Sequence, residues 1–288
     1  MKKIIIEFIK LFLNISPNWV LLTLPYKFPS LLKFIPKNRK FISNYYLNNL
    51  KVNIDTYYRV ERQLLLRIYE EDSSYIFKKF IKKGDFCLDI GANIGALSLL
   101  MCKLVGPTGK IYSFEPGPQN FARLLGNIKL NPSFLGIAQL IQAGVSDKPG
   151  KLYWEEESHN PGNARLVKKG NIEVPVITID HFFINNPLEK LNFVKIDVET
   201  MEHEVLSGGV NTWKKYRPIL YFETQEEFRF RETENEKLDL YLKIEELLTP
   251  IGYSLYMLRD HKIIKTTSAS LGGNTIAIHN QDISLLNK

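Results

Sequence analysis

Five acidic residues stand at or just past the ends of short apolar stretches that are typical of buried strands. In chain order they are Asp89, Glu115, Asp147, Asp197 and Glu223. In an open α/β sheet, ligands bind beyond the carboxyl ends of the strands, so acids on several strand ends meet at one edge. Carboxylates there can accept hydrogen bonds from a ligand's hydroxyl groups or take a proton from one. The sequence therefore predicts a ligand site at this edge.

The first two acids belong to one unit, residues 85–115, with the order strand, glycine turn, helix, strand. Its turn follows Asp89 and has the spacing G-x-x-x-G, with Gly91 and Gly95 on either side of Asn93. Glycines let the backbone approach a cofactor, and an acid on the second strand end, here Glu115, accepts hydrogen bonds from ribose hydroxyls. This unit is typical of a site for an adenosine-containing cofactor.

The turn lacks the third glycine of the dinucleotide pattern G-x-G-x-x-G, and no phosphate-binding lysine follows it. A cofactor with adenosine but no phosphate, such as S-adenosylmethionine, fits better than NAD or ATP. The turn would meet its amino-acid end, the acid on the second strand its ribose, and the acid after the third strand its adenine. The predicted cofactor-binding residues are Asp89, Gly91, Asn93, Gly95, Glu115 and Asp147.

Predicted strands and helices alternate along most of the chain, which implies a mainly parallel sheet with helices on both faces. Helical patterns cover 57–83, 119–130 and 232–248, and extended ones cover 138–145, 151–157, 172–179, 193–196, 218–222, 253–258 and 275–278. A polar stretch, 158–170, is predicted to be a loop near the site. Cys87 and Cys102 lie in apolar surroundings without metal-ligand spacing, so buried reduced thiols are expected.

Positive charge is concentrated at the start of the chain. The whole chain carries +7, but residues 1–60 hold ten Lys and Arg against two acids, which leaves the rest near neutral. That distribution argues against a nucleic-acid groove along the core. We expect a basic, amphipathic, helical extension over 1–56 and a catalytic domain over 57–288. Residues 1–41 either contact a membrane surface peripherally or form a helical cap on the core.

Four ordered stretches resemble the FkbM-type S-adenosylmethionine-dependent methyltransferases. They are LDIGANIG (88–95), YSFEPGPQNFARLLGNIKLN (112–131), VKIDVETMEHEVLSGG (194–209) and RPILYFE (217–223). The resemblance spans roughly residues 80–280. It implies a Rossmann-like fold with a seven-stranded sheet whose last strand is antiparallel, and O-methylation, commonly of sugar or natural-product hydroxyls. The family's D-V-E-G reads D-V-E-T here, and Thr200 adds bulk near the presumed acceptor.

A hydroxyl acceptor needs a base that takes its proton in the transition state. Asp197 and Glu199 are two residues apart after a predicted strand, so in extended geometry both can face one side. We favour Asp197 as the base; Glu202 matches a family acid, and Glu223 ends the next strand. His203, alone on a short helix, is more typical of a structural or surface residue. Paired acids can bind a divalent metal, but this spacing does not demand one, and none is predicted.

The sequence thus predicts a cytoplasmic S-adenosylmethionine-dependent O-methyltransferase acting on a hydroxyl of a glycan, glycolipid or related small molecule. Two alternatives remain. A nicotinamide-dependent oxidoreductase would share the first strand, turn and helix, but the missing glycine and the lack of a clear Tyr-x-x-x-Lys pattern count against it. A non-catalytic, membrane-associated binding module is favoured by the basic extension and by Thr200.

Overall fold

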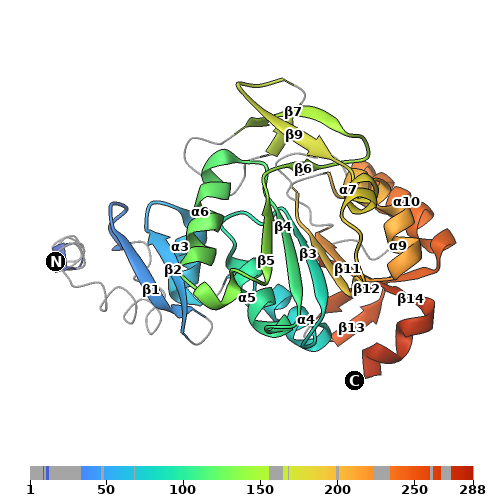
Figure 1. Ribbon diagram of the computed structural model, residues 1–288, viewed down its shortest axis with the longest axis horizontal. Helices are drawn as coiled ribbons and strands as arrows, with labels where there is room; N and C mark the ends of the chain where they lie inside the picture. Colours follow the sequence, from blue (N-terminus) through green and yellow to red (C-terminus); the bar gives the residue numbers. More distant parts are fainter. Residues whose placement is uncertain are drawn as a thin grey trace.

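The computed structural model describes residues 9, 11–12, 34–46, 49–67, 69–155, 165–167, 169–198, 201–223, 234–259, 262–266 and 274–287. Its centre is a sheet of eight strands with helices on both faces (Figure 1). In spatial order the strands are β13 (Lys262–Lys265), β12 (Tyr253–Arg259), β14 (Asn274–His279), β11 (Ile219–Glu223), β10 (Phe193–Ile196), β3 (Phe86–Ile90), β4 (Lys110–Phe114) and β5 (Ala138–Ile141).

The sheet is parallel from β5 through β11, and β14 then runs antiparallel to both β11 and β12. This is the predicted Rossmann-like methyltransferase fold with its last strand antiparallel; β13 is an eighth strand that the sequence analysis missed. The chain builds outward from β3 through β4 to β5, and later from β10 to β11 on the other side. The reversal falls between β3 and β10, and such a switch point is where ligands bind in open α/β sheets.

Two hydrophobic cores lie on the two faces of the sheet because alternate strand residues point to opposite sides. One core contains side chains of α3 (Arg59–Leu66), α4 (Glu71–Phe80), α5 (Ala96–Val105) and α6 (Pro118–Lys129). The other packs around α7 (Ile179–Asn185), α8 (Glu202–Ser207), α9 (Val210–Tyr216) and α10 (Glu234–Leu248). The helical pattern at 57–83 forms two helices, with Arg67 in the left-handed conformation after the first. Both cysteines are free and buried, as predicted.

A second, four-stranded sheet lies beyond the carboxyl ends of β3 and β4 (Figure 1). Its spatial order is β6 (Gly144–Val145), β9 (Ile172–Ile177), β7 (Gly150–Glu155) and β8 (Arg165–Val167). The predicted strand at 138–145 is therefore two strands: β5 stays in the main sheet, and β6 joins the small one. Short 3₁₀ helices complete the described fold at η2 (Pro132–Phe134), η4 (Thr249–Ile251) and η5 (Asn280–Asn287).

The predicted helical extension is wrong for residues 40–55, which form the antiparallel hairpin of β1 (Lys40–Tyr46) and β2 (Leu50–Asp55). Alternate residues of β2 are buried, and this period of two is typical of a strand with one face on a core. Most of residues 1–33 lies outside the described ranges. Among the residues that are described, no helix is long and apolar enough to cross a membrane.

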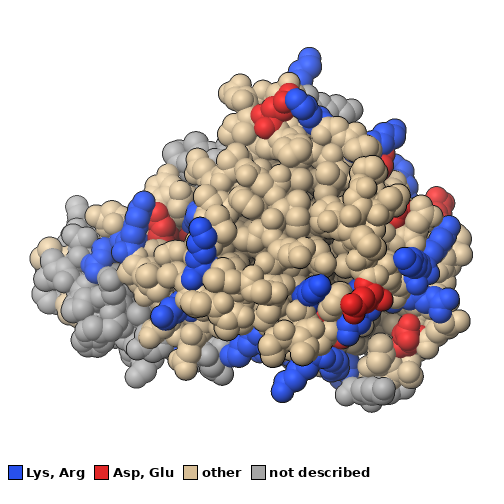
Figure 2. All heavy atoms as spheres, in the orientation of Figure 1, with Lys and Arg blue, Asp and Glu red and all other residues tan. Residues whose placement is uncertain are grey.

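Lysine and arginine side chains are scattered over the face shown in Figure 2, with many of them toward its lower and right edges. On the described part of this face they do not gather into a continuous groove. The division of the chain at residue 56 stays a prediction, because the hairpin packs directly against α3 and α6 of the following domain.

Two buried asparagines, Asn127 in α6 and Asn131 just after it, connect the hairpin to the main domain. The side-chain oxygen of Asn127 accepts a hydrogen bond from the Asn53 backbone at 2.8 Å, and its amide donates to the Ile94 carbonyl at 2.8 Å. Asn131 pairs in the same way with the backbone of Lys51, at 3.0 and 2.7 Å. Asn127 thereby joins the hairpin to the turn before α5.

We expect Asn127→Ala to lower the free energy of unfolding by about 1–3 kcal/mol, because buried backbone groups lose their partners. Urea denaturation measures this change. Asn185→Ala, at an exposed position whose amide bonds only within its own helix, is the matched control and should change stability by less than about 0.5 kcal/mol. Equal effects of the two variants would contradict this role for Asn127.

Candidate active site

Strand register places polar residues in two rows across the carboxyl half of the sheet. Across β4, β3, β10 and β11, consecutive register partners form the first row: Ser113, Asp89, Lys195 and Tyr221. Two residues further along the chain, at or just past the ends of these strands, come Glu115, Gly91, Asp197 and Glu223. Because side chains two apart in a strand share a face, both rows belong to the side covered by α4 and α5. The sequence analysis predicted most of the second row and missed Lys195 in the first.

Lys195 is the charged centre of these rows. Its side chain is 4% exposed, and its Nζ donates to the Gly91 carbonyl at 2.8 Å. The same Nζ lies 3.3 Å from Asp89 Oδ1 and 3.3 Å from Asp197 Oδ2. Burial alone would lower the pKa of Lys195, but the carboxylates of Asp197, Asp89 and Glu70 raise it above its usual value. Lys195 therefore stays protonated and joins the glycine turn to the chain after β10.

Asp89 lies beneath the glycine turn, fully buried. One of its oxygens faces Lys195, and the other accepts a hydrogen bond from Ser98 of α5 at 2.5 Å. Ser98 in turn lies 3.0 Å from the Ser113 hydroxyl. Asp89 is not among the residues that line the pocket described next, so its contacts place it as a support for the turn.

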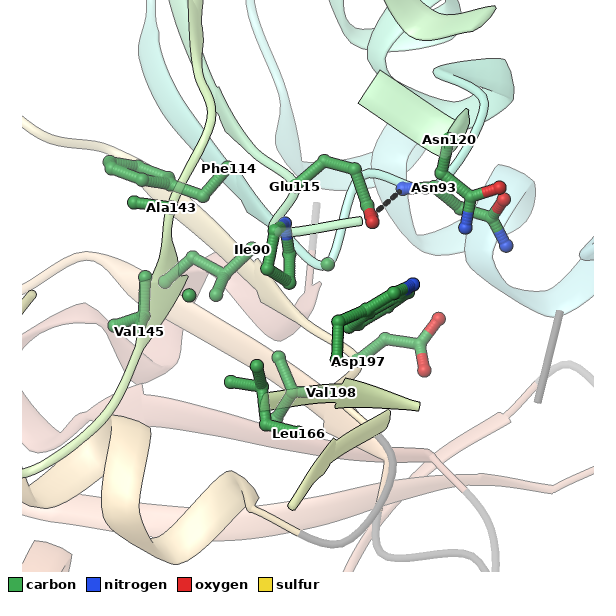
Figure 3. Close-up of a pocket in the computed structure, with 14 residues that line it drawn as sticks. Ile90, Asn93, Phe114, Glu115, Asn120, Ala143, Val145, Leu166, Asp197 and Val198 are labelled. Atoms are coloured by element: carbon green, nitrogen blue, oxygen red, sulfur yellow. Dashed lines mark hydrogen bonds between the residues drawn. The ribbon is translucent and has the colours of Figure 1, made fainter. Parts of the chain in front are cut away.

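A pocket opens at the switch point between β3 and β10, with an empty volume of about 550 Å³ including the solvent at its mouth. Its walls come from the turn after β3, the end of β4, the chain from 143 to 145, the small sheet and the chain after β10 (Figure 3). Its polar residues are Asn93, Glu115, Asn120 and Asp197. The small sheet contributes Trp154 of β7 and Leu166 of β8, besides Gly144 and Val145 of β6.

The glycine turn approaches its neighbours too closely for a side chain at Gly91. Gly91 has a φ of +78°, and a Cβ there would lie 1.8 Å from the carbonyl oxygen of Asp197. Asn93 is also left-handed, with a φ of 51°. Its backbone N–H donates to Glu115 at 2.8 Å, the bond drawn in Figure 3. The turn is thus shaped by Asp197 on one side and by Glu115 on the other.

Glu115 is a buried carboxylate that lines the pocket and is 2% exposed. Burial raises its pKa to about 7, although hydrogen bonds from the backbone N–H groups of Gly117, at 2.9 Å, and Asn93 oppose this shift. Each of its oxygens accepts one of these bonds, which leaves further lone pairs on both. A buried carboxylate with remaining acceptor capacity can hold ribose hydroxyls.

The other predicted cofactor residues lie around the pocket or outside it. Gly91 and Asn93 line it, as Glu115 does. Gly95 is the N-cap of α5 and packs against Leu124 of α6, outside the lining. Asp147 is exposed beyond β6, 3.9 Å from Lys148, and is also outside the lining. Ala143, Gly144 and Val145 line the pocket instead, because the chain leaves the main sheet after β5.

The predicted catalytic acids have different surroundings. Asp197 lines the pocket, and its side chain is 31% exposed. Glu202 is buried and accepts a hydrogen bond from the Val198 backbone at 3.3 Å, so it supports the chain after β10. Glu223 ends β11, partly buried and outside the lining. Glu199, Thr200 and most of the predicted loop at 158–170 lie outside the described residues. Among the residues that are described, no cluster of three or more metal-ligating side chains occurs.

Sequence reasoning missed Lys195 and Trp154. Lys195 had a usable signal, because a lysine inside a short apolar strand is rarely buried without a charged partner. Trp154 had none, since its position in the pocket depends on how the small sheet lies over the main one.

Three features together define an enzyme that binds a cofactor containing a nucleoside. They are a Rossmann-like sheet, a glycine turn at its switch point, and an acid on the next strand end that can bind ribose.

The sequence profile of the Methyltransferase FkbM domain matches residues 89–255, more than half of the chain. The chain therefore belongs to this family and is an S-adenosylmethionine-dependent methyltransferase, which decides against the nicotinamide-dependent alternative. Glu115, Gly91 and the absence of a phosphate-binding group in the turn fit that cofactor. The glycine turn would meet the amino-acid end of the cofactor, and the buried acid would hold its ribose.

Three relatives show the range of similarity. Methyltransferase sdnD of Sordaria araneosa is 30% identical over 196 residues, covering 56% of this chain and 74% of that protein. Hexuronic acid methyltransferase AglP of Haloferax volcanii is 27% identical, covering 49% and 57%. The 31-O-demethyl-FK506 methyltransferase FkbM of Streptomyces tacrolimicus is 25% identical, covering 56% and 74%.

Glu115 predicts a pH dependence of cofactor affinity. Only the ionised carboxylate offers its full acceptor capacity, and its pKa is about 7. Affinity for S-adenosylhomocysteine should therefore be about tenfold weaker at pH 6 than at pH 8. Calorimetry at the two pH values measures this ratio. Glu115→Gln, which cannot ionise, should bind weakly at both; a wild-type affinity that is equal at pH 6 and pH 8 would count against the ribose role.

Proposed function

We propose that this enzyme transfers a methyl group to a hydroxyl group of a glycan, glycolipid or related small molecule. The observation that carries the proposal is the carboxylate of Asp197 in the wall of the pocket that Glu115 also lines. A proton acceptor and a cofactor-binding acid thus share one site. S-adenosylmethionine supplies a methyl group activated by its sulfonium sulfur.

Asp197 would accept the proton of the acceptor hydroxyl, which is a poor nucleophile until that proton leaves. The backbone of this residue is held against Gly91, because its N–H donates to the Ile90 carbonyl at 3.0 Å. Its carboxylate is held by Lys195. Methyl transfer is an in-line displacement, so fixing the proton acceptor relative to the cofactor turn provides much of the catalysis.

The acceptor side of the site favours hydroxyl-rich molecules. The carboxylate of Asp197 in the pocket wall offers hydrogen-bond acceptors to hydroxyl groups. Trp154 contributes an apolar, aromatic surface to the same pocket. The names of the Haloferax and Streptomyces relatives support a sugar or a hydroxylated natural product as the class of acceptor.

Calorimetry with S-adenosylmethionine or S-adenosylhomocysteine tests the proposed function. The folded full-length chain should bind either one, and failure of a folded sample to bind both would refute it. Native mass spectrometry followed by a screen of glycan acceptors then identifies the hydroxyl that is methylated.

Asp197→Asn should lower turnover by roughly 10²–10⁴-fold, because the amide cannot take the hydroxyl proton. Cofactor affinity should change by less than about threefold, since Lys195 keeps Asp89 and the Gly91 carbonyl as partners. Glu189→Gln makes the same carboxylate-to-amide change at an exposed position before β10 and should leave turnover at the wild-type rate. Unchanged turnover in Asp197→Asn would remove this residue from the role of base.

A further inference from the structure

Asn120 is a buried polar residue in the pocket lining that the predicted site does not include. It is the third residue of α6 and is only 3% exposed. The oxygen of its carboxamide group accepts no hydrogen bond from any residue that the structure describes. Buried acceptors without a partner are rare in folded proteins, because nothing replaces the water that they lose. An orphaned acceptor in the lining of a ligand pocket indicates that the ligand supplies the missing donor.

The other buried asparagines of this region show what a structural asparagine does. Asn127, two turns further along α6, accepts a hydrogen bond from the hairpin backbone and donates one to the Ile94 carbonyl, both at 2.8 Å. Asn131 likewise bonds the hairpin backbone with both ends of its amide, at 3.0 and 2.7 Å. The oxygens of these two side chains hold elements of the fold together. The oxygen of Asn120 holds none among the described residues.

Asn120 lies at the end of the pocket that also holds the carboxylate of Glu115. The backbone N–H of Gly117, directly before α6, donates to one oxygen of Glu115 at 2.9 Å, and that of Asn93 donates to the other at 2.8 Å. Asn120 follows Gly117 by three residues, in the first turn of the helix. Figure 3 shows Asn120 and Asn93 at the end of the pocket toward which the Glu115 carboxylate points. Both side chains therefore border one part of a bound ligand.

The opposite end of the pocket is apolar. Phe114, Ala143 and Val145 line it, on the other side of Glu115 in Figure 3. S-adenosylmethionine carries three kinds of hydrogen-bond donor: the adenine amino group, the ammonium group and the two ribose hydroxyls. Adenine fits the apolar end, and the ammonium group would lie with the amino-acid end at the glycine turn. The ribose hydroxyls are therefore the donors that Asn120 can accept.

We propose that Asn120 is a second ribose-binding residue, whose carboxamide oxygen accepts a hydrogen bond from one ribose hydroxyl while Glu115 accepts one from the other. Each hydroxyl has one proton to donate, so two acceptors satisfy both. The contact also supplies the donor that the Asn120 oxygen lacks. This inference concerns the binding of the cofactor alone, so it does not depend on the identity of the group that is methylated.

The first test is Asn120→Leu, which removes the amide and keeps a side chain of similar size. Calorimetry should show that it binds S-adenosylhomocysteine roughly threefold to tenfold more weakly than wild type, because one hydrogen bond is lost. The urea midpoint of the ligand-free variant should be no lower than that of wild type, since no hydrogen bond between described residues is lost at the oxygen. An affinity equal to that of wild type would overturn the proposal. So would a loss of affinity accompanied by a lower midpoint, because Asn120 would then be structural.

Asn185→Leu is the matched control, because it makes the same replacement at an exposed position at the end of α7. Its affinity for S-adenosylhomocysteine should equal that of wild type. An equal loss of affinity in both variants would overturn the proposal, since the effect would not belong to the pocket.

Ligands with an altered ribose identify the donor. The 2′-deoxy and 3′-deoxy forms of S-adenosylhomocysteine each lack one hydroxyl group. With one of these forms, wild type and Asn120→Leu should bind equally well, because the contact is already absent. With the other, the affinity ratio found for the parent ligand should remain. A ratio that is unchanged with both forms would overturn the proposal, because the donor would then belong to adenine or to the ammonium group.

A crystal structure of the wild-type chain with S-adenosylhomocysteine is a test that needs no variant. The carboxamide group of Asn120 should lie within about 3.2 Å of a ribose hydroxyl oxygen. A bound ribose that contacts Glu115 and not Asn120 would overturn the proposal. A chain that shows this contact but methylates no hydroxyl group would refute the proposed function and leave the role of Asn120 in place.

Discussion

The buried ammonium group of Lys195 is the interaction on which the rest of the site depends. Moving a charge out of water costs several kcal/mol, and excellent partners are needed to offset that cost. Lys195 has two carboxylates at 3.3 Å and a carbonyl at 2.8 Å. The two carboxylates are those of Asp89, beneath the glycine turn, and Asp197, in the pocket wall; the carbonyl is that of Gly91 in the turn itself. One charge therefore couples the two halves of the site.

Parallel strands in register convert this local requirement into a functional arrangement. Residues at the same level on β4, β3, β10 and β11 become neighbours. The reversal of strand order between β3 and β10 opens the crevice at the same place. There the backbone of Gly91 passes so close to Asp197 that only glycine fits. The acceptor-side acid and the cofactor turn cannot move independently.

Much of the main sheet could be predicted from sequence, because its signals are local: apolar runs, turn residues and acids near the ends of β3, β4, β10 and β11. The positions of Glu115 and Asp197 in one pocket followed from the rule that parallel strands present their carboxyl ends together. The hairpin at 40–55 was missed although Leu50, Val52 and Ile54 alternate with polar residues. The amphipathic helical spacing at the start of the chain led to the expectation of a helical extension over 1–56.

The remaining differences depend on contacts between distant parts of the chain. Asp147 was placed near adenine on the assumption that 138–145 is one strand, but the chain turns into the small sheet after Ile141. Strand alternation directs Asp89 to the buried side, beneath the turn. Phe77 of α4 packs on Phe193 of β10 and Tyr221 of β11, across more than a hundred residues of sequence. Local patterns carry no information about such contacts.

Lys195→Met most directly tests whether one buried charge holds the two halves together. The variant should lose about 3–5 kcal/mol of unfolding free energy, because Asp89 and Asp197 are left unpaired. Its folded fraction should bind S-adenosylhomocysteine at least about tenfold more weakly, since the Gly91 turn loses its support. Lys190→Met, at an exposed position just before β10, should match wild type in both measurements. A Lys195→Met protein with wild-type stability and affinity would contradict the account.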